Sequence, residues 1–284
     1  MRKFLILVSV IVISMLLPIS AHAINLISTE MEIEIGRSVR DDVLDEYDEW
    51  TRPEDVQLVN TLTSRLLEFT TREGIDYEFH IIESDEINAF AAPGGFIFLT
   101  TGILDFTNRD PAMIAGVLAH EIGHVERKHG RDRMQDALLR QLGFSILLGA
   151  FDMDEEAVQI AAGVALVLVE QGYSREDEYD ADRIGVKLTY LSGWYPSDGL
   201  ISFLDKLDKE IPGNDDLGEV GQWFSSHPET ARRVMFANEY LDEVSGDYVF
   251  SEYPLPEAPP PPDKEEEAID KPESTERHVI WERK

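Results

Sequence analysis

The chain has 284 residues, of which 56 are acidic and 25 are basic, so its formal net charge is −31. Such an excess of negative charge argues against nucleic acids and anionic lipid headgroups as partners, because both are themselves negatively charged. The chain contains no cysteine, which excludes disulfide bonds. The fold must therefore depend on an apolar core or on a bound metal ion.

The first 23 residues have the three parts of a secretory signal peptide. Arg2 and Lys3 supply a short positive region, Phe4–Leu17 an apolar run, and Ala21-His-Ala23 a small-x-small cleavage site. The apolar run is shorter than the roughly 20 residues that a bilayer-spanning helix needs. We therefore expect cleavage after Ala23 rather than a retained membrane anchor, and no stable membrane span in the mature chain.

After the signal peptide the sequence predicts one domain over 24–250 that is rich in helices. Apolar residues at helical spacing predict most of its elements, and two short stretches alternate as strands do. Asp110 is a natural N-cap, and Pro111 suits the first position of the helix that follows it. The expected helices lie at about 27–47, 53–70, from 111 onward, and at 138–151, 157–169, 174–191, 195–209 and 229–244, and the expected strands lie at 77–81 and 96–100.

Two apolar runs and a proline-rich acidic C-terminal segment differ in composition from the rest of the chain. The runs 138–151 and 157–169 are strongly apolar but too short to cross a bilayer, which favours a buried pair of helices over an exposed apolar flap. From residue 251 onward, proline and acidic residues replace apolar ones. That change predicts a disordered tail over 251–284.

The helix that begins at Pro111 contains the motif His120-Glu121-x-x-His124. Residues four apart lie one turn apart on the same face of a helix. Two imidazoles at that spacing can bind one metal ion, and Glu121 can reach a water molecule on that metal. The motif can also arise by chance, as two histidines on an ordinary helix, so the rest of the chain has to decide.

Two histidines do not complete a catalytic zinc site, which takes three protein ligands and keeps one position for water. The segment after Ser174 offers several acids, of which Glu178 and Asp182 lie one turn apart on one helix face. If Glu178 binds zinc, Asp182 can hydrogen-bond the far nitrogen of a zinc-binding imidazole. The alternative is that the acids form a solvated helix face, which is what we expect of Glu176 and Asp177.

These two motifs together resemble the gluzincin metallopeptidases of the HtpX and CAAX-prenyl-protease group, and most closely their soluble periplasmic members. The likeness spans roughly residues 27–241 and includes further blocks in the family's order. These are Ile27-Ser-Thr-Glu30, Gly36, Asn88-Ala-Phe-Ala-Ala-Pro-Gly-Gly95, Thr101-Gly-Ile-Leu104, Ser226-His227-Pro228 and Arg232-Arg233. The resemblance implies a zincin-like metallopeptidase domain, which is an α+β fold, mainly helical, with a small β-sheet and an active-site helix.

The resemblance also implies a role for each matching residue. It implies one zinc ion bound by His120, His124 and Glu178. Glu121 is then the general base, which takes a proton from the attacking water and passes it to the leaving amine. Asp182 is expected behind the ligands, where it orients one of the two imidazoles.

Residues outside the two motifs are expected to complete the site. A developing oxyanion needs a donor besides zinc, and His227 and Arg233 are our candidates, because their segment resembles the family's His-Pro segment. His227 can alternatively fill the open position of the zinc and hold the enzyme latent, or simply cap a helix. His129, about 140° around the helix from His124, is expected at the surface. The Asn88–Leu99 block predicts a strand edge to which an extended substrate adds.

We therefore expect a secreted zinc metalloendopeptidase that acts in the periplasm, or outside the cell, on misfolded or envelope proteins. Its expected partners are unfolded or misassembled protein substrates and the outer-membrane assembly machinery. The alternative is a chaperone-like binding protein for unfolded outer-membrane clients, with a latent metal site. The presence of Glu121 favours the enzyme, because a binding protein needs no general base.

Overall fold

The computed structural model describes residues 27–142, 155–195, 197–210, 227, 230–247 and 253–262. Its helices are α2 (Thr29–Glu46), α3 (Pro53–Leu66), α4 (Thr101–Phe106), α5 (Pro111–Glu126), α6 (His129–Leu142), α8 (Glu155–Glu170), α9 (Arg175–Ser192), α10 (Gly199–Glu210) and α12 (Thr230–Asp247), with the 3-10 turns η1 (Leu67–Phe69) and η2 (Pro93–Gly95). Its strands are β1 (Glu78–Ile82), β2 (Ala89–Ala92), β3 (Phe96–Thr100), β4 (Trp194–Tyr195) and β5 (Tyr253–Pro254). The expected signal peptide lies outside the described residues.

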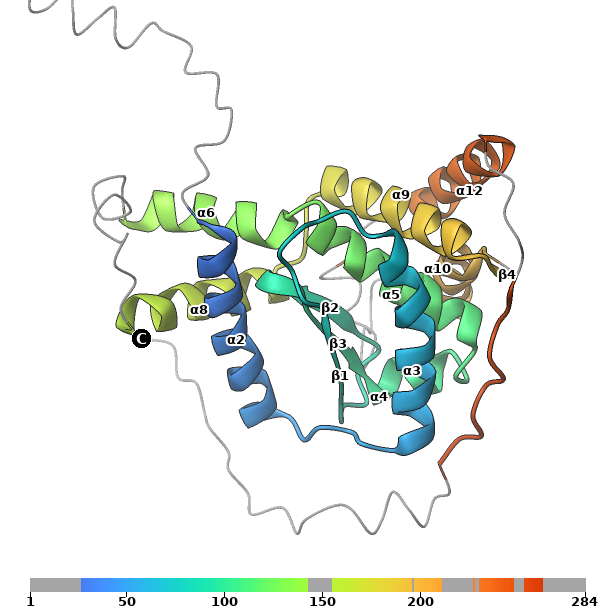
Figure 1. The fold of residues 1–284 in the computed structure, drawn as a ribbon, viewed down its shortest axis with the longest axis horizontal. Coiled ribbons are helices and arrows are strands. Elements are labelled where there is room, and N and C mark those ends of the chain that lie inside the picture. Colours follow the sequence, from blue (N-terminus) through green and yellow to red (C-terminus); the bar gives the residue numbers. More distant parts are fainter. Residues whose placement is uncertain are drawn as a thin grey trace, which may run out of the picture.

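A three-stranded sheet lies between two groups of helices (Figure 1). The strand order is β1-β3-β2, with β3 parallel to β1 and antiparallel to β2. Successive side chains of a strand point to opposite faces. Ile97 and Leu99 accordingly join the apolar core that includes α3, α5, α9 and α10, whereas Phe96 and Phe98 join a second core with α2, α6 and α8. The sheet thus separates two cores.

Helix α5 carries the HExxH motif through the first of these cores. Asp110 caps it by accepting hydrogen bonds from the backbone N–H groups of Ala112 and Met113. Every residue from Ile114 to Val125 is buried, and the helix packs against α9, α10, α3 and β2. A helix that is apolar on all sides is buried on all sides, so the polar motif residues it carries are buried as well.

Small residues let α9 approach the motif closely. A Cβ atom at Gly123 would lie 2.7 Å from the backbone oxygen of Ala181 on α9. A Cβ atom at Gly185, on α9, would lie 3.0 Å from the backbone nitrogen of His120. The backbones of the two helices therefore meet at the metal-binding turn, at a separation that a larger side chain would not permit.

Most of the expected elements are confirmed within a few residues of their predicted bounds. The α+β fold class, mainly helical with a small sheet, is confirmed as well. Strand β2 has no counterpart among the expected elements, because a run of three alanines and one phenylalanine has little strand propensity. Helix α6 includes only residues 138–142 of the expected helix 138–151, and the remainder of that prediction lies outside the described residues.

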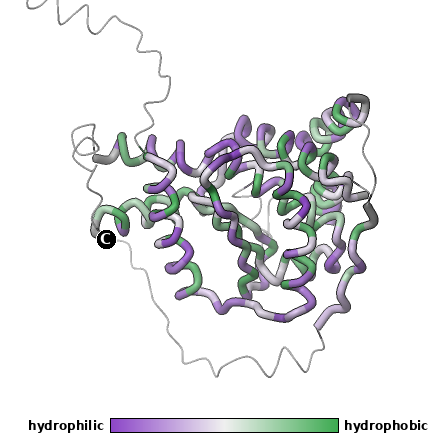
Figure 2. The backbone as a smooth tube through the Cα atoms, viewed as in Figure 1, coloured by the Kyte–Doolittle hydropathy of each residue, from purple (hydrophilic) through white to green (hydrophobic). Residues whose placement is uncertain are grey.

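Helix α8, which contains the expected apolar helix 157–169, is partly buried, whereas its expected pairing with 138–151 stays a prediction. Helix α8 packs against α6 and α2, where Ala161, Ala162 and Ala165 are buried, while Ile160 and Val167 are about half exposed. Figure 2 shows hydrophilic residues interspersed along α2 and α9, whereas α8 is mainly hydrophobic. Within the described part of the chain, no helix has both the length and the apolar character needed to cross a membrane.

The structure describes residues 253–262 of the segment that was expected to be a disordered tail. Strand β5 pairs in parallel with β4, and Leu255 packs against the core that contains α5. Leu255 is partly buried in this contact, which anchors the segment to the domain. Residues 263–284 lie outside the described residues, and for them the tail stays a prediction.

We predict that Gly123→Ala destabilises the domain by about 1–3 kcal/mol, the usual effect of forcing extra atoms into a packed contact. The added methyl group would collide with the Ala181 carbonyl and separate α5 from α9. Chemical denaturation measures the free energy of unfolding. The matched control is Gly163→Ala in α8, where the new methyl group meets no atom within 4 Å. This change should be neutral or stabilising, because alanine is the better helix former. Equal stability of the two variants would contradict the proposed contact.

Candidate metal centre

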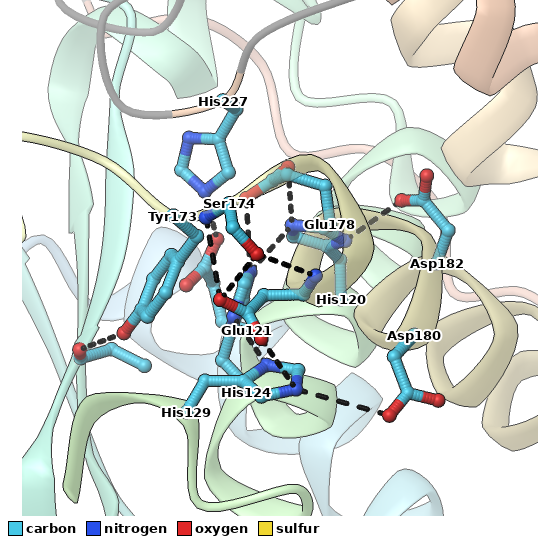
Figure 3. Close-up of polar contacts among 12 residues, drawn as sticks. His120, Glu121, His124, His129, Tyr173, Ser174, Glu178, Asp180, Asp182 and His227 are labelled. Carbon is cyan, nitrogen blue, oxygen red and sulfur yellow. Dashed lines mark hydrogen bonds and ion pairs between the residues drawn. The ribbon is translucent and has the colours of Figure 1, made fainter. Parts of the chain in front are cut away.

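Helix α5 presents both motif histidines to one point inside the domain. The Nε2 atoms of His120 and His124 lie 3.1 Å apart, and both side chains are buried. Glu121, between them in the sequence, is also buried. Figure 3 shows the three side chains gathered together. The helical spacing predicted from the sequence thus brings two imidazole nitrogens together at one point, as a metal site requires.

Helix α9 adds a carboxylate to this pair. Ser174 caps α9 through a reciprocal capping box with Asp177, which fixes where the helix begins. Glu178 lies in the first turns that follow, with Oε2 3.6 Å from His120 Nε2 and Oε1 3.4 Å from His124 Nε2. The three side chains expected to bind zinc are therefore brought together.

His227 approaches the same point from another part of the chain. Ligand atoms of His120, His124, Glu178 and His227 all lie within 4.8 Å of one another, and all four residues are buried. The Nε2 atom of His227 is also 3.3 Å from Oε1 of Glu121. His227 thus lies where a fourth ligand or a substrate-facing donor would lie.

Asp182 and Arg233 lie behind the ligands. Oδ1 of Asp182 is 2.9 Å from Nδ1 of His120, which is the contact expected of a carboxylate that orients a ligand imidazole. Arg233, on α12, donates hydrogen bonds from Nε and Nη2 to both oxygens of Asp182, at 2.8 and 2.7 Å. Its Nη1 is 2.6 Å from Oε2 of Glu178. The contacts of Arg233 favour a role in holding these two acids over the expected donation to an oxyanion, which stays untested.

The expectation that His129 lies at the surface is wrong. His129 is 8% exposed, and its Nδ1 atom lies 3.0 Å from Nδ1 of His124. The expected angle assumed one continuous helix, but α5 ends at Glu126 and Lys128 adopts a positive φ of 63°. This turn returns the chain toward the site. The sequence offers no glycine at position 128 that would have marked it.

Tyr173 is a site residue that the sequence did not single out. Its ring stacks on the His124 imidazole, with 3.8 Å between ring centroids, and its hydroxyl donates to the carbonyl of Ala91 at 3.4 Å. It therefore bridges a metal-ligand candidate and strand β2. The sequence offered one signal for Tyr173, which is its position directly before Ser174. Ser174 is the N-cap of α9 and so determines where Glu178 lies.

Burial and neighbouring charges set the pKa values of the site. Burial raises the pKa of Glu121, but His227, His120 and His124 together outweigh it, so that the pKa is lowered. Burial and the neighbouring His120 lower the pKa of His124 well below its usual range. Burial raises the pKa of Asp182, yet Arg233 and His120 together outweigh that effect and lower the pKa. These shifts favour a neutral His124 imidazole, the form that binds a metal, and ionised carboxylates at Glu121 and Asp182.

The donor set fits zinc. Two imidazole nitrogens and one carboxylate are a known catalytic combination, and ligands about 2.0–2.1 Å from a tetrahedral zinc lie roughly 3.3 Å from one another. The corresponding separations among His120, His124 and Glu178 are 3.1, 3.4 and 3.6 Å. Oε1 of Glu178 is buried, and no donor among the described residues hydrogen-bonds it. An atom of that kind favours a cation as its partner.

Comparison with known proteins gives an independent result. The model of Peptidase family M48 matches residues 53–241, a segment that contains all the residues of the site described above. This match confirms the resemblance to gluzincin metallopeptidases, of which the HtpX and CAAX-prenyl-protease group is a related branch.

Individual relatives carry protease names. The chain is 31% identical over 209 residues to the beta-barrel assembly-enhancing protease of Yersinia pestis, covering 69% of this chain and 42% of that protein. It is 33% identical over 160 residues to the protein of that name in Escherichia coli K12, covering 53% and 32%. It is 25% identical over 225 residues to the mitochondrial metalloendopeptidase OMA1 of Schizosaccharomyces pombe, covering 78% and 64%. The chain thus spans less than half the length of these two bacterial relatives.

We predict that Asp182→Asn weakens zinc binding by about 10–100-fold, which is the usual effect of changing the partner of a ligand histidine. The substitution keeps the side-chain shape but removes the charge that faces His120 and Arg233. Competition with a zinc chelator measures the dissociation constant. Glu176→Gln is the matched control, because Glu176 is an exposed acid on the same helix and its loss should leave zinc binding unchanged. An Asp182→Asn protein with wild-type zinc affinity would contradict the assignment.

Proposed function

Because this chain belongs to Peptidase family M48 and is by family a metallopeptidase, we propose that it is a zinc-dependent endopeptidase that cleaves misfolded or misassembled envelope proteins. The observation that carries the proposal is the meeting of His120, His124 and Glu178 in one buried cluster, with the carboxylate of Glu121 beside them. A site that only stabilises the fold does not need that additional carboxylate, whereas peptide hydrolysis requires a base.

The chemistry divides between the metal and the residues of the chain. A bound zinc ion supplies Lewis acidity, which polarises the peptide carbonyl and makes an attacking water more acidic. Glu121 removes the proton from that water and passes it to the leaving amine. His120 and His124 would hold the ion through their Nε2 nitrogens, and Asp182 would keep the proton of His120 on Nδ1.

Strand β2 is our candidate for the substrate-binding edge. It is an outer strand, and no strand of the described residues pairs with its other side. The N–H of Thr100 donates to the carbonyl of Asn88, so the antiparallel alternation directs the polar groups of Ala89 and Ala91 away from β3. The hydroxyl of Tyr173 contacts the Ala91 carbonyl on that open side. An extended peptide can add there as a further strand and reach the metal ligands.

His227 is proposed to hold the protein latent. A catalytic zinc site keeps one position open, whereas four protein ligands close it. The position of His227 within the cluster supports the role of fourth ligand, which has to leave before a substrate carbonyl can bind. Donation to the oxyanion is the competing role, and the same residue can serve it only from outside the metal's coordination shell.

The biological setting is proposed from the relatives. Two of them are named for enhancing beta-barrel assembly. We therefore propose the periplasm as the compartment, with the segment 1–23 as signal peptide. Unassembled outer-membrane proteins are the proposed substrates, and the machinery that assembles them is the proposed partner.

We predict that Glu121→Gln reduces casein cleavage by about 10²–10⁴-fold, the usual contribution of a general base, while zinc content stays at one per chain. Glutamine keeps the shape of the side chain but cannot take the proton. Zinc analysis and cleavage are measured in parallel on the mature wild type and the variant. Retained hydrolysis would refute the base assignment. Zinc in both proteins with cleavage by neither, even after His227 is replaced, would favour a chaperone-like binding protein.

We predict that His227→Ala raises casein cleavage several-fold, because the fourth position of the metal becomes available to water and substrate. Cleavage is compared at equal zinc content, with His80→Ala as the control, since His80 lies on β1 outside the metal-ligand cluster. Lower activity of the His227 variant would contradict latency and favour oxyanion stabilisation.

A further inference from the structure

We propose that His129 is a positioning residue that accepts a hydrogen bond from the metal ligand His124 and connects it to the acids Asp177 and Asp180 of helix α9. The inference rests on the proposed zinc site. It concerns how tightly and in which orientation the ion is held, and it assigns a role to a residue outside the family motifs quoted above.

The first argument is the direction of the His124 ring. Its Nε2 atom faces the cluster, 3.1 Å from His120 Nε2 and 3.4 Å from Glu178 Oε1. Its Nδ1 atom faces the opposite way, toward His129 Nδ1 at 3.0 Å. An imidazole that binds a metal through Nε2 carries its proton on Nδ1. The proton of His124 therefore points directly at His129.

The second argument follows from that proton. If His124 donates, Nδ1 of His129 has to accept, so the proton of His129 lies on Nε2. That nitrogen faces two carboxylates, at 3.6 Å from Asp177 Oδ1 and 3.8 Å from Asp180 Oδ2 (Figure 3). These distances exceed those of a direct hydrogen bond, but the negative charges favour a proton on the nitrogen that faces them. The acids thus select the tautomer of His129 that can accept from His124.

The third argument is that the acids are themselves fixed. Oδ2 of Asp177 accepts a hydrogen bond from the hydroxyl of Ser174 at 2.8 Å, which leaves Oδ1 facing His129. Asp180 pairs with Arg127, the residue at the end of α5. Asp177, which the sequence suggested to be part of a solvated face, is therefore both a helix cap and a neighbour of His129.

The two metal histidines are consequently supported by the same helix in different ways. His120 contacts a carboxylate of α9 directly, at 2.9 Å from Asp182. On its Nδ1 side, away from Glu178, His124 faces Asp177 and Asp180 of α9 through the His129 ring. Tyr173 covers the face of His124, so His129 is the polar partner of its Nδ1 atom. His129 is not a further metal ligand, because it lies on the side of His124 away from the cluster.

The test compares His129→Asn with His129→Leu, whose side chains have the same branching and the same number of non-hydrogen atoms. Asparagine can place its Oδ1 atom where Nδ1 of histidine accepts, whereas leucine offers no acceptor. We expect leucine to weaken zinc binding by about 10–100-fold, as loss of such a partner does, and asparagine to restore most of it. Chelator competition gives the zinc dissociation constant without any measurement of activity. His80→Leu controls for the loss of a histidine elsewhere, and it should not change that constant.

The outcomes separate this inference from the proposed function. Wild-type protein that binds zinc and cleaves casein, together with equal zinc affinity in both His129 variants, overturns the role of His129 and leaves the peptidase intact. Wild-type protein that binds no zinc overturns both. Equal weakening in both variants also overturns the role, because it shows a packing effect rather than a lost acceptor.

A second measurement does not depend on any variant folding. In the zinc-loaded wild type, nitrogen–proton correlation spectra should show a slowly exchanging proton on Nδ1 of His124, protected by its bond to His129. Rapid exchange of that proton with solvent would overturn the proposal.

Discussion

The close approach of α5 and α9 is the constraint on which the site depends. The backbones meet where Gly123 faces Ala181 and where Gly185 faces His120. At this separation the side chain of Glu178 reaches the imidazoles of His120 and His124 on the other helix. A wider spacing would move the carboxylate beyond ligand distance of the histidines. Gly123 and Gly185 are therefore as necessary to this geometry as the candidate metal ligands are.

Burying so many polar groups is unfavourable unless each charge has a partner. Arg233 meets this requirement by contacting both Asp182 and Glu178 from a third helix, α12. The guanidinium is planar and presents several donors at fixed angles, so it also orients the two acids it neutralises. The result is a layer of paired charged groups behind the candidate ligands.

The N-terminal helix contributes to the other side of the site. Glu32 on α2 is buried, accepts a hydrogen bond from the backbone N–H of Gly94, and pairs with Arg72. Gly94 adopts a φ of 82°, a conformation that suits glycine, and its turn leads from β2 into β3. The acid on α2 thus holds the turn that ends the candidate substrate edge. The hydrogen bond between Gly94 and Glu32 thus joins the sequence blocks near residues 30 and 94 at one place in the fold.

The sequence by itself determined the local elements and the chemistry they carry. The caps at Asp110 and Ser174 are short-range patterns, and helical periodicity places His120, Glu121 and His124 on one turn without reference to the rest of the chain. The apolar spacing of the remaining helices predicted their positions for the same reason. Glu178 stood out because a family motif marks it, not because the spacing alone selects it among its acidic neighbours.

Only the tertiary structure decided which distant groups share the site. His129 was misplaced because a turn at Lys128, with no glycine to mark it, interrupts the assumed helix. Tyr173, Arg233 and the pairing of β5 with β4 depend on contacts between residues far apart in the chain. Local propensity carries no information about such contacts, because they form only when separate elements pack together. The candidate ligands and Asp182 were therefore readable from the sequence, whereas the places of His129 and Tyr173 beside His124 were not.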